Sequence, residues 1–183
     1  MIAGLRQAEA RAQKVVFERY AGRMLAVCAR YIGDRYTAEE VLMDGFMRVF
    51  ERIEQYKNEG SFEGWMRRIM VNESLMYLRR HKHWLAEMAL DEAPEVQDEA
   101  DYHLTLDSEE LLRLIEALPE GYRTIFNLYA IEGYSHTEIA RMLNISESTS
   151  KSQLHRARAV LQRQLSEMSR KKNSKLYESA PIG

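Results

Sequence analysis

Residues 132–158 have the sequence EGYSHTEIARMLNISESTSKSQLHRAR, which predicts two helices joined by a tight turn. Ser135 stands just before the first helix and Glu138 follows three residues later, the spacing of a capping box in which each side chain satisfies a backbone amide of the other residue. Asn144 is a residue type that tolerates the left-handed conformation of such a turn, and Ser146 can cap the second helix. The stretch therefore predicts a helix-turn-helix.

The second of these helices has two different faces. One stripe must pack on a core, because its members are spaced at i, i+4, i+7 and i+11: Ser150, Leu154, Ala157 and Leu161. The opposite side carries short hydrogen-bonding groups and cations, which suit base edges and phosphates in a DNA major groove. A solvated basic helix on an unrelated bundle is the alternative, but the capped helix in front of it favours DNA. We expect DNA contacts from Ser148, Thr149, Lys151, Ser152, Gln153, His155, Arg156 and Arg158.

Charge is distributed unevenly along the chain, whose formal net charge is −2. Residues 1–86 carry 15 basic and 11 acidic side chains, residues 87–110 carry 0 and 10, and residues 111–183 carry 11 and 7. The acidic stretch contains Pro94 and little helical periodicity, so it predicts an extended linker. A solvated spacer without a function of its own is the alternative interpretation of this stretch.

The chain has 183 residues, of which 45% are hydrophobic, so it can form two small cores. Apolar positions repeat with helical spacing in both lobes, without strand-like alternation, and this predicts an all-α fold. We expect two small helical domains joined by a flexible acidic linker. The predicted boundaries are an N-terminal helical domain at 1–84, the linker at 85–106, a C-terminal helix-turn-helix domain at 107–166, and a frayed basic tail at 167–183.

Three helices are predicted in the N-terminal lobe. The first ends at Gly33, and a capping box formed by Thr37 and Glu40 opens the second. Ser61 can cap the third helix, which ends in a run of basic residues. Gly45 lies inside the second helix, where glycine costs about 1 kcal/mol relative to alanine, so we expect the surface there either to be locally looser or to have a partner of different shape.

Several classes of function are disfavoured by the sequence. It contains no apolar run of about 18 residues and no signal-peptide core, which predicts a cytoplasmic protein without membrane insertion. Cys28 is the single cysteine and falls on an apolar helix face, where a core thiol is expected. His81 and His83 are more simply part of a basic helix end than metal ligands. No catalytic spacing or glycine-rich phosphate loop occurs, so we expect no catalytic residue, metal or cofactor.

Motifs in both lobes, in the same order, resemble the extracytoplasmic-function group of bacterial sigma factors, within the sigma-70 superfamily. The likeness spans residues 10–165. It implies a non-enzymatic factor that binds RNA polymerase core, recognises the −35 and −10 promoter elements, and melts DNA. The motifs include Ala38-Glu39-Glu40-Val41, Leu78-Arg79-Arg80, Leu118-Pro119, Glu138-Ile139-Ala140 and Leu154-His155-Arg156-Ala157-Arg158.

The resemblance also implies roles for individual residues. The second helix of the helix-turn-helix would enter the −35 major groove. Phe62 and Trp65 are expected in the core, because they are spaced at i and i+3 on an apolar helix face. Clamp helices of the polymerase β′ subunit would bind Glu39, Glu40, Met43, Asp44 and Met47. A melting loop and the helix after it would bind the −10 element through Tyr56, Lys57, Asn58, Ser61, Arg67, Arg68, Asn72, Arg79 and Arg80.

The partners implied by the resemblance are the β′ and β subunits of RNA polymerase core, promoter DNA and an anti-sigma factor. The acidic linker would run through polymerase channels that hold nucleic acid. A free-standing helix-turn-helix regulator is one alternative, although such proteins usually need a dimer to span two half-sites, and the sequence offers no clear dimer seam. An adaptor that binds only protein is another alternative, and an enzyme is the weakest.

Overall fold

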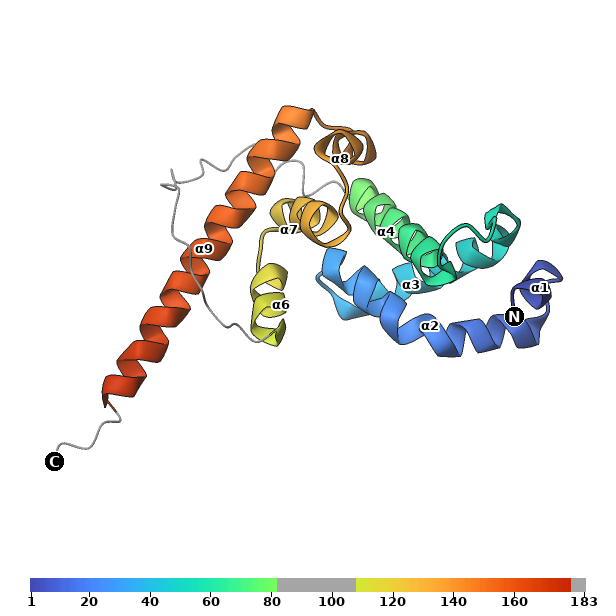
Figure 1. The fold of residues 1–183 in the computed structure, drawn as a ribbon, viewed down its shortest axis with the longest axis horizontal. Helices are drawn as coiled ribbons and strands as arrows, with labels where there is room; N and C mark the ends of the chain where they lie inside the picture. The colour runs from blue at the N-terminus through green and yellow to red at the C-terminus, as the bar shows by residue number, and fades with distance from the viewer. Residues whose placement is uncertain (82–107, 179–183) are drawn as a thin grey trace. The chain divides into compact units, whose positions relative to one another are not determined.

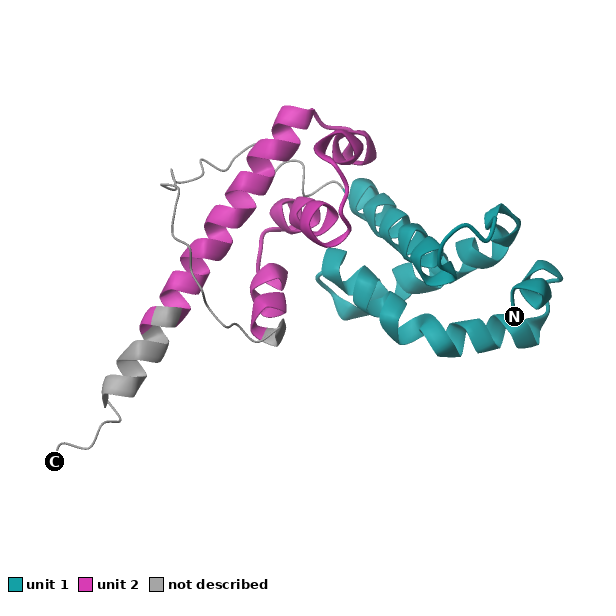
Figure 2. Cartoon of the chain, viewed as in Figure 1, with its two compact units in different colours: residues 1–86 teal, residues 87–183 magenta. Residues whose placement is uncertain are grey.

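The structure, a computed structural model, describes residues 1–81 and 108–178. Within these ranges it contains helices and no strand, which confirms the all-α prediction. The chain divides into two compact units, unit 1 at residues 1–86 and unit 2 at residues 87–183 (Figure 2). The acidic linker predicted at 85–106 lies outside the described residues.

Unit 1 is built from three long helices that pack against one another in pairs (Figure 1). They are α2 (Ala10–Tyr31), α3 (Arg35–Glu51) and α4 (Phe62–His81). A short helix, α1 (Ile2–Arg6), precedes them, and a 3-10 turn, η1 (Ile53–Gln55), follows α3. The sequence did not predict α1 as a separate element.

Large apolar side chains from all three long helices fill the centre of unit 1. Fully burying a Phe or Met side chain stabilises a fold by about 1.5 to 3 kcal/mol. Cys28 is also buried, as predicted, and burial raises the pKa of its thiol to about 11. The largest fully buried side chains of this core are Met24, Tyr31, Phe46, Met66 and Met70.

The start of α3 differs from the prediction. Asp34 caps this helix, because its Oδ2 accepts hydrogen bonds from the backbone N of Thr37 at 2.8 Å and from Thr37 Oγ1 at 2.7 Å. These bonds lower the pKa of the Asp34 carboxyl. Thr37 therefore lies inside the first turn, and the prediction that it is the cap was wrong. The predicted cap of α4 is confirmed, since the backbone N of Gly64 donates to Ser61 Oγ at 3.0 Å.

Gly45 lies at a close contact between α3 and α4. It is buried, and a Cβ at this position would overlap Sδ of Met70 and lie 3.0 Å from its Cε. The missing side chain at Gly45 allows α3 and α4 to approach each other closely at this point.

Within residues 108–178, unit 2 contains four α-helices, of which α9 is the longest and packs against the other three (Figure 1). Pro119 precedes the second helix as its N-cap, so the predicted break at this proline is confirmed. A π-helical turn, η2 (Asn127–Ile131), leads toward the helix-turn-helix. The helices are α6 (Ser108–Glu116), α7 (Glu120–Phe126), α8 (His136–Leu143) and α9 (Glu147–Glu178).

Helix α9 confirms one prediction and corrects another. Its predicted core stripe is buried, with Ser150 and Ala157 at 0% exposure, and Ala157 and Leu161 pack against α6 and α7 residues. The helix continues to Glu178, so the expectation of a frayed chain from residue 167 was wrong up to that point. Residues 166–178 contain neither glycine nor proline and many good helix formers, which explains the extension.

Candidate nucleic-acid interface

The turn between α8 and α9 has the geometry that the sequence predicted. The backbone N of Ser135 donates to Glu138 Oε2 at 2.8 Å, and the backbone N of Glu138 donates to Ser135 Oγ at 3.3 Å, which forms the capping box. Asn144 ends α8 in the left-handed conformation, at φ 55° and ψ 48°. Because hydrogen bonds from Ser135 stabilise the charged carboxylate, the pKa of Glu138 is lowered.

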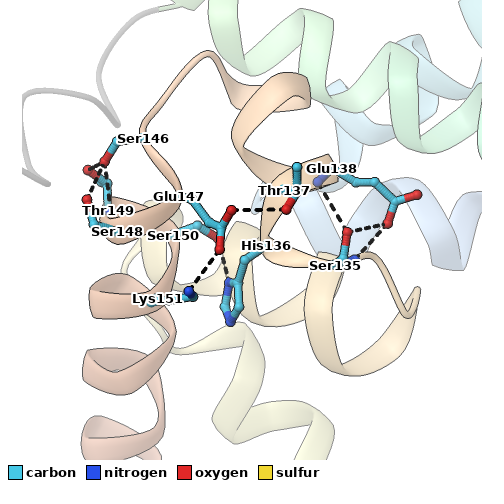
Figure 3. Close-up of polar contacts among 10 residues, drawn as sticks. All are labelled: Ser135, His136, Thr137, Glu138, Ser146, Glu147, Ser148, Thr149, Ser150 and Lys151. Carbon is cyan, nitrogen blue, oxygen red and sulfur yellow. Dashed lines mark hydrogen bonds and ion pairs between the residues drawn. The ribbon is translucent and has the colours of Figure 1, made fainter.

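Hydroxyl groups organise the first turn of α9 (Figure 3). Ser146 is the cap, as predicted, since its Oγ accepts from the backbone N of Thr149 at 3.0 Å. The same Oγ lies 2.8 Å from Ser148 Oγ and 2.7 Å from Thr149 Oγ1. Two predicted DNA-contacting hydroxyls therefore already share hydrogen bonds with the cap.

Two side-chain contacts join α8 to α9, and an ion pair within α9 adjoins them (Figure 3). Thr137 Oγ1 donates to Glu147 Oε2 at 3.0 Å, and Glu147 Oε1 lies 2.8 Å from the Lys151 ammonium. Nδ1 of His136 lies 2.9 Å from the buried Ser150 Oγ and shares a hydrogen bond with it. The angle between the two helices of the helix-turn-helix is thus set by polar contacts as well as by packing.

The ring of Tyr129 lies close to both His136 and an exposed cation of α9. His136 stacks on Tyr129 with ring centroids 4.6 Å apart, and the Arg158 guanidinium lies 5.7 Å from the centroid of the Tyr129 ring. Burial is the largest cause of a lowered pKa at His136, and the positive charge of Lys151 adds to it. Both effects favour the neutral form of the imidazole.

Seven of the eight residues predicted to contact the −35 element are at least partly accessible. Gln153 is the exception, because only 3% of it is exposed, and this corrects its prediction as a base contact. Its Oε1 has no hydrogen-bond partner among the described residues. Thr149 and Arg156 are half-buried. The exposed members are Ser148, Lys151, Ser152, His155 and Arg158.

The loop before α4 holds one predicted base-contacting residue in the core. Tyr56 is 5% exposed, its ring packs against Phe62 and Trp65 with centroids 5.2 and 5.5 Å away, and its hydroxyl donates to the carbonyl O of Gly60 at 2.9 Å. Its ring is therefore not available to a base, which corrects that prediction. Asn58 and Gly60 adopt φ values of 60° and 80°, and they turn the loop sharply.

The remaining −10 candidates are placed on one loop and one helix. Ser61 is exposed, but its hydroxyl is already used as the cap of α4. Phe62 is buried and Trp65 is half-buried against it, so the core packing expected for this pair is confirmed for Phe62 and partial for Trp65. Arg67 is half-buried. The exposed members are Lys57, Asn58, Arg68, Asn72, Arg79 and Arg80.

The predicted polymerase-binding residues lie on the outer surface of α3. All five, Glu39, Glu40, Met43, Asp44 and Met47, are exposed. Met43 and Met47 are 52% and 57% exposed, which is unusual for methionine and typical of a surface that binds another protein. A groove between α3 and α4 adjoins them, lined by Asp44, Met47, Arg48, Glu51, Glu73, Met76 and Arg80.

Neither a metal-binding cluster nor a membrane-spanning helix is found in the parts of the chain that the structure describes. No three His, Cys, Asp or Glu residues within 1–81 and 108–178 are grouped so that they could hold an ion. No helix in these ranges is long and apolar enough to cross a bilayer.

Comparison with protein families identifies both units. Residues 16–83 match the family model described as Sigma-70 region 2, and residues 108–161 match Sigma-70, region 4. These matches cover α4 with its preceding loop in unit 1 and the helix-turn-helix in unit 2.

Similar proteins cover most of the chain. SigW of Bacillus subtilis, an ECF RNA polymerase sigma factor, is 30% identical over 161 residues, which are 81% of this chain and 86% of that protein. SigE of Mycolicibacterium smegmatis is 30% identical over 78% of this chain, which spans only 57% of its length. The ECF RNA polymerase sigma-E factor of Haemophilus influenzae is 27% identical over 90% of this chain and 93% of its own.

A solved structure shares the fold. The sigma factor RpoE of Bartonella quintana, crystallised with the anti-sigma factor NepR, superposes with a TM-score of 0.51. The alignment covers 84% of this chain and 96% of that chain at 19% sequence identity.

Proposed function

Because this chain belongs to the extracytoplasmic-function group of RNA polymerase sigma factors, we propose that its two units divide promoter recognition between them. The protein binds RNA polymerase core and directs it to promoters, unit 2 recognises the −35 element, and unit 1 recognises and melts the −10 element. Sigma factors act as transcription-initiation factors, so no reaction is assigned to the chain itself. Since its polymerase partner works in the bacterial cytoplasm, we place the protein there.

The observation that carries the −35 assignment is the exposed side of α9, held in place by α8. Arg156 and Ser152 are the candidates for base contacts, and Lys151 and Arg158 are the candidates for phosphate contacts, because these two exposed cations flank that pair along α9. His155 also lies on this exposed side. Gln153 is omitted from the set because it is buried.

The −10 assignment is supported by the exposed loop residues Lys57 and Asn58, with Asn72 on α4. Melting requires that an unstacked base be captured, since unstacking costs a few kcal/mol. Stacking and cationic groups supply this energy in proteins that bind single strands. Tyr56 supports the loop from beneath, and the exposed cations Arg68, Arg79 and Arg80 hold the phosphates of the separated strand.

The α3 surface with its two exposed methionines binds the β′ clamp helices. An anti-sigma factor would inhibit the protein by covering the same surface, as the co-crystallised relative from Bartonella quintana also binds an anti-sigma factor. The acidic linker, residues 85–106, would follow the polymerase channels that hold nucleic acid, where its carboxylates act as a displaceable mimic of RNA.

Gel filtration of the purified protein with sigma-free RNA polymerase core tests this function. We expect stoichiometric co-elution that the primary sigma factor displaces by competition. The variant Met43→Glu should lose co-elution, and the control Val15→Glu, which changes an apolar residue of similar exposure on α2, should retain it. Elution apart from core, with DNA bound by the protein alone, would instead identify a free-standing regulator.

A further inference from the structure

Helix α1 is attached to the segment that leads into the −10 loop. The Arg6 guanidinium donates from Nη2 to the carbonyl O of Tyr56 at 3.0 Å, and its Nε lies 3.7 Å from Glu54 Oε2. Leu5, the preceding residue, is only 2% exposed. Fifty residues of chain separate Arg6 from Tyr56, so this contact joins two distant parts of unit 1.

Helix α1 cannot be stable by itself, because its five residues are far fewer than an isolated helix needs. It ends in a Schellman motif, in which the backbone N of Glu9 donates to Gly4 O at 2.9 Å and the backbone N of Ala8 donates to Leu5 O at 3.0 Å. Ala8 adopts a φ of 54°, a strained conformation for alanine that persists where surrounding contacts impose it. The buried Leu5 and the contacts of Arg6 help to hold α1 in place.

The carbonyl that Arg6 binds has a defined effect on the loop. The Tyr56 carbonyl and the Lys57 amide belong to one planar peptide group, so a bond to the carbonyl sets the direction in which the chain enters Lys57. The far end of the loop is held by the Tyr56 hydroxyl, which donates to Gly60 O. Tyr56 thus closes the loop, while Arg6 orients the peptide that precedes its exposed residues Lys57 and Asn58.

We propose that Arg6 is a positioning residue for base capture by the 56–60 loop. It touches no DNA itself and acts by holding the Tyr56–Lys57 peptide in the orientation that presents Lys57 and Asn58 to the unstacked strand. This inference rests on the proposed function of the loop in −10 recognition. The partner that the loop takes is a single-stranded segment of promoter DNA.

The test uses the complete chain in complex with RNA polymerase core. The probe is the single-stranded oligonucleotide that the wild-type holoenzyme selects from a random pool, and binding is measured by fluorescence anisotropy. Arg6→Ala should weaken binding of this probe about five- to tenfold, the size expected when one intramolecular hydrogen bond of ordinary net strength is lost. Affinity for core, and for a duplex selected from a random pool through unit 2, should stay unchanged.

Two variants provide matched comparisons. Arg11→Ala removes the same charge from an exposed position on α2 and should bind the oligonucleotide like the wild type. Arg6→Lys retains the charge and one donor, so it should recover part of the lost affinity. In hydrogen exchange of the free protein, Arg6→Ala should speed exchange of the 57–60 amides while the amides of α3 and α4 keep their protection.

The outcomes separate this inference from the proposed function. Wild-type oligonucleotide binding by Arg6→Ala, together with weakened binding by Lys57→Ala, would overturn the role of Arg6 and leave the function of the loop intact. If neither variant weakened binding, the assignment of the loop to the −10 element would itself fail. Equal loss of core binding and oligonucleotide binding in Arg6→Ala, with exchange accelerated throughout unit 1, would make α1 a general structural support and would also overturn the proposal.

Discussion

The contact between Gly45 and Met70 predicts how unit 1 responds to one added methyl group. A Cβ at Gly45 would overlap Met70 Sδ and lie 3.0 Å from its Cε. Met70 is fully buried, so its side chain must move within the core to make room for the added Cβ. The substitution Gly45→Ala therefore forces either a strained Met70 rotamer or a separation of α3 from α4.

Two opposing effects determine the stability of Gly45→Ala. Alanine favours the helix by about 1 kcal/mol relative to glycine, whereas overpacking a dense core costs about 1 to 3 kcal/mol. We expect a net loss of about 0 to 2 kcal/mol in the free energy of unfolding. In a Met70→Ala background the overlap disappears, so Gly45→Ala should stabilise unit 1 by about 1 kcal/mol. The double-mutant cycle should give a coupling energy of about 1 to 3 kcal/mol.

Urea denaturation followed by tryptophan fluorescence measures these values, because both tryptophans, Trp65 and Trp84, belong to unit 1. Gly22→Ala is the matched control, since Gly22 is an exposed glycine of α2 whose added Cβ meets nothing within 4 Å. This control should stabilise unit 1 by about 1 kcal/mol in either background. If Gly45→Ala stabilised the wild type as much as Gly22→Ala does, the reasoning would be refuted.

Three further predictions concern unit 2. Arg156→Ala should reduce discrimination between promoter sequences by about 1 to 3 kcal/mol, whereas Lys151→Ala should weaken binding to all DNA sequences alike and lower the salt dependence of binding. Competition binding at several salt concentrations tests both variants. Unchanged selectivity in Arg156→Ala would contradict the assignment of Arg156 to base contacts. Gln153→Leu should leave the affinity for duplex DNA unchanged and maintain or raise the stability of unit 2. The reason is that the Gln153 side chain is buried and its Oε1 has no hydrogen-bond partner among the described residues. Weakened duplex binding, measured by anisotropy, would contradict this prediction. Because the pKa of His136 is lowered in the folded protein, the unfolded chain binds a proton at this residue more readily than the folded chain does. The contribution of His136 to stability is therefore complete above a pH of about 6.5 and is lost as the pH falls. Hydrogen exchange of α8 and α9 should show this loss in the wild type and not in His136→Gln.

The parts of the helix-turn-helix that the sequence predicted correctly depend on neighbours three or four residues apart. The capping box of Ser135 and Glu138, the left-handed Asn144 and the cap at Ser146 are all of this kind. Competition between two local caps explains the error at α3. Asp34 stands three residues before Thr37, and its carboxylate accepts both Thr37 donors, so the charged acceptor becomes the cap.

The errors at the candidate site have different causes. Gln153 lies three residues after Ser150 and four before Ala157, both members of the buried stripe, so helical spacing did contain a signal of its burial. Tyr56 is buried by Phe62 and Trp65 after a loop whose shape no local pattern specifies.

Long-range contacts could not be predicted from the sequence at all. Arg6 meets the Tyr56 carbonyl across fifty residues, and Gly45 meets Met70 from another helix. Neither pair has a periodic spacing, so a single sequence contains no signal that joins them.

The hydrogen bonds of Ser152 predict which bases this position can recognise. Its hydroxyl donates to the carbonyl O of Thr149 at 3.0 Å, so the single hydroxyl proton is already used within α9. The oxygen retains lone pairs and can still accept a hydrogen bond. In the major groove, adenine and cytosine present amino donors, whereas guanine presents only acceptors on its edge. Ser152 should therefore favour adenine or cytosine, and guanine recognition should depend on Arg156. Duplexes selected from a random pool should lose a preference for adenine or cytosine at one position in Ser152→Ala and keep their guanine preference; loss of a guanine preference instead would contradict this assignment of donors.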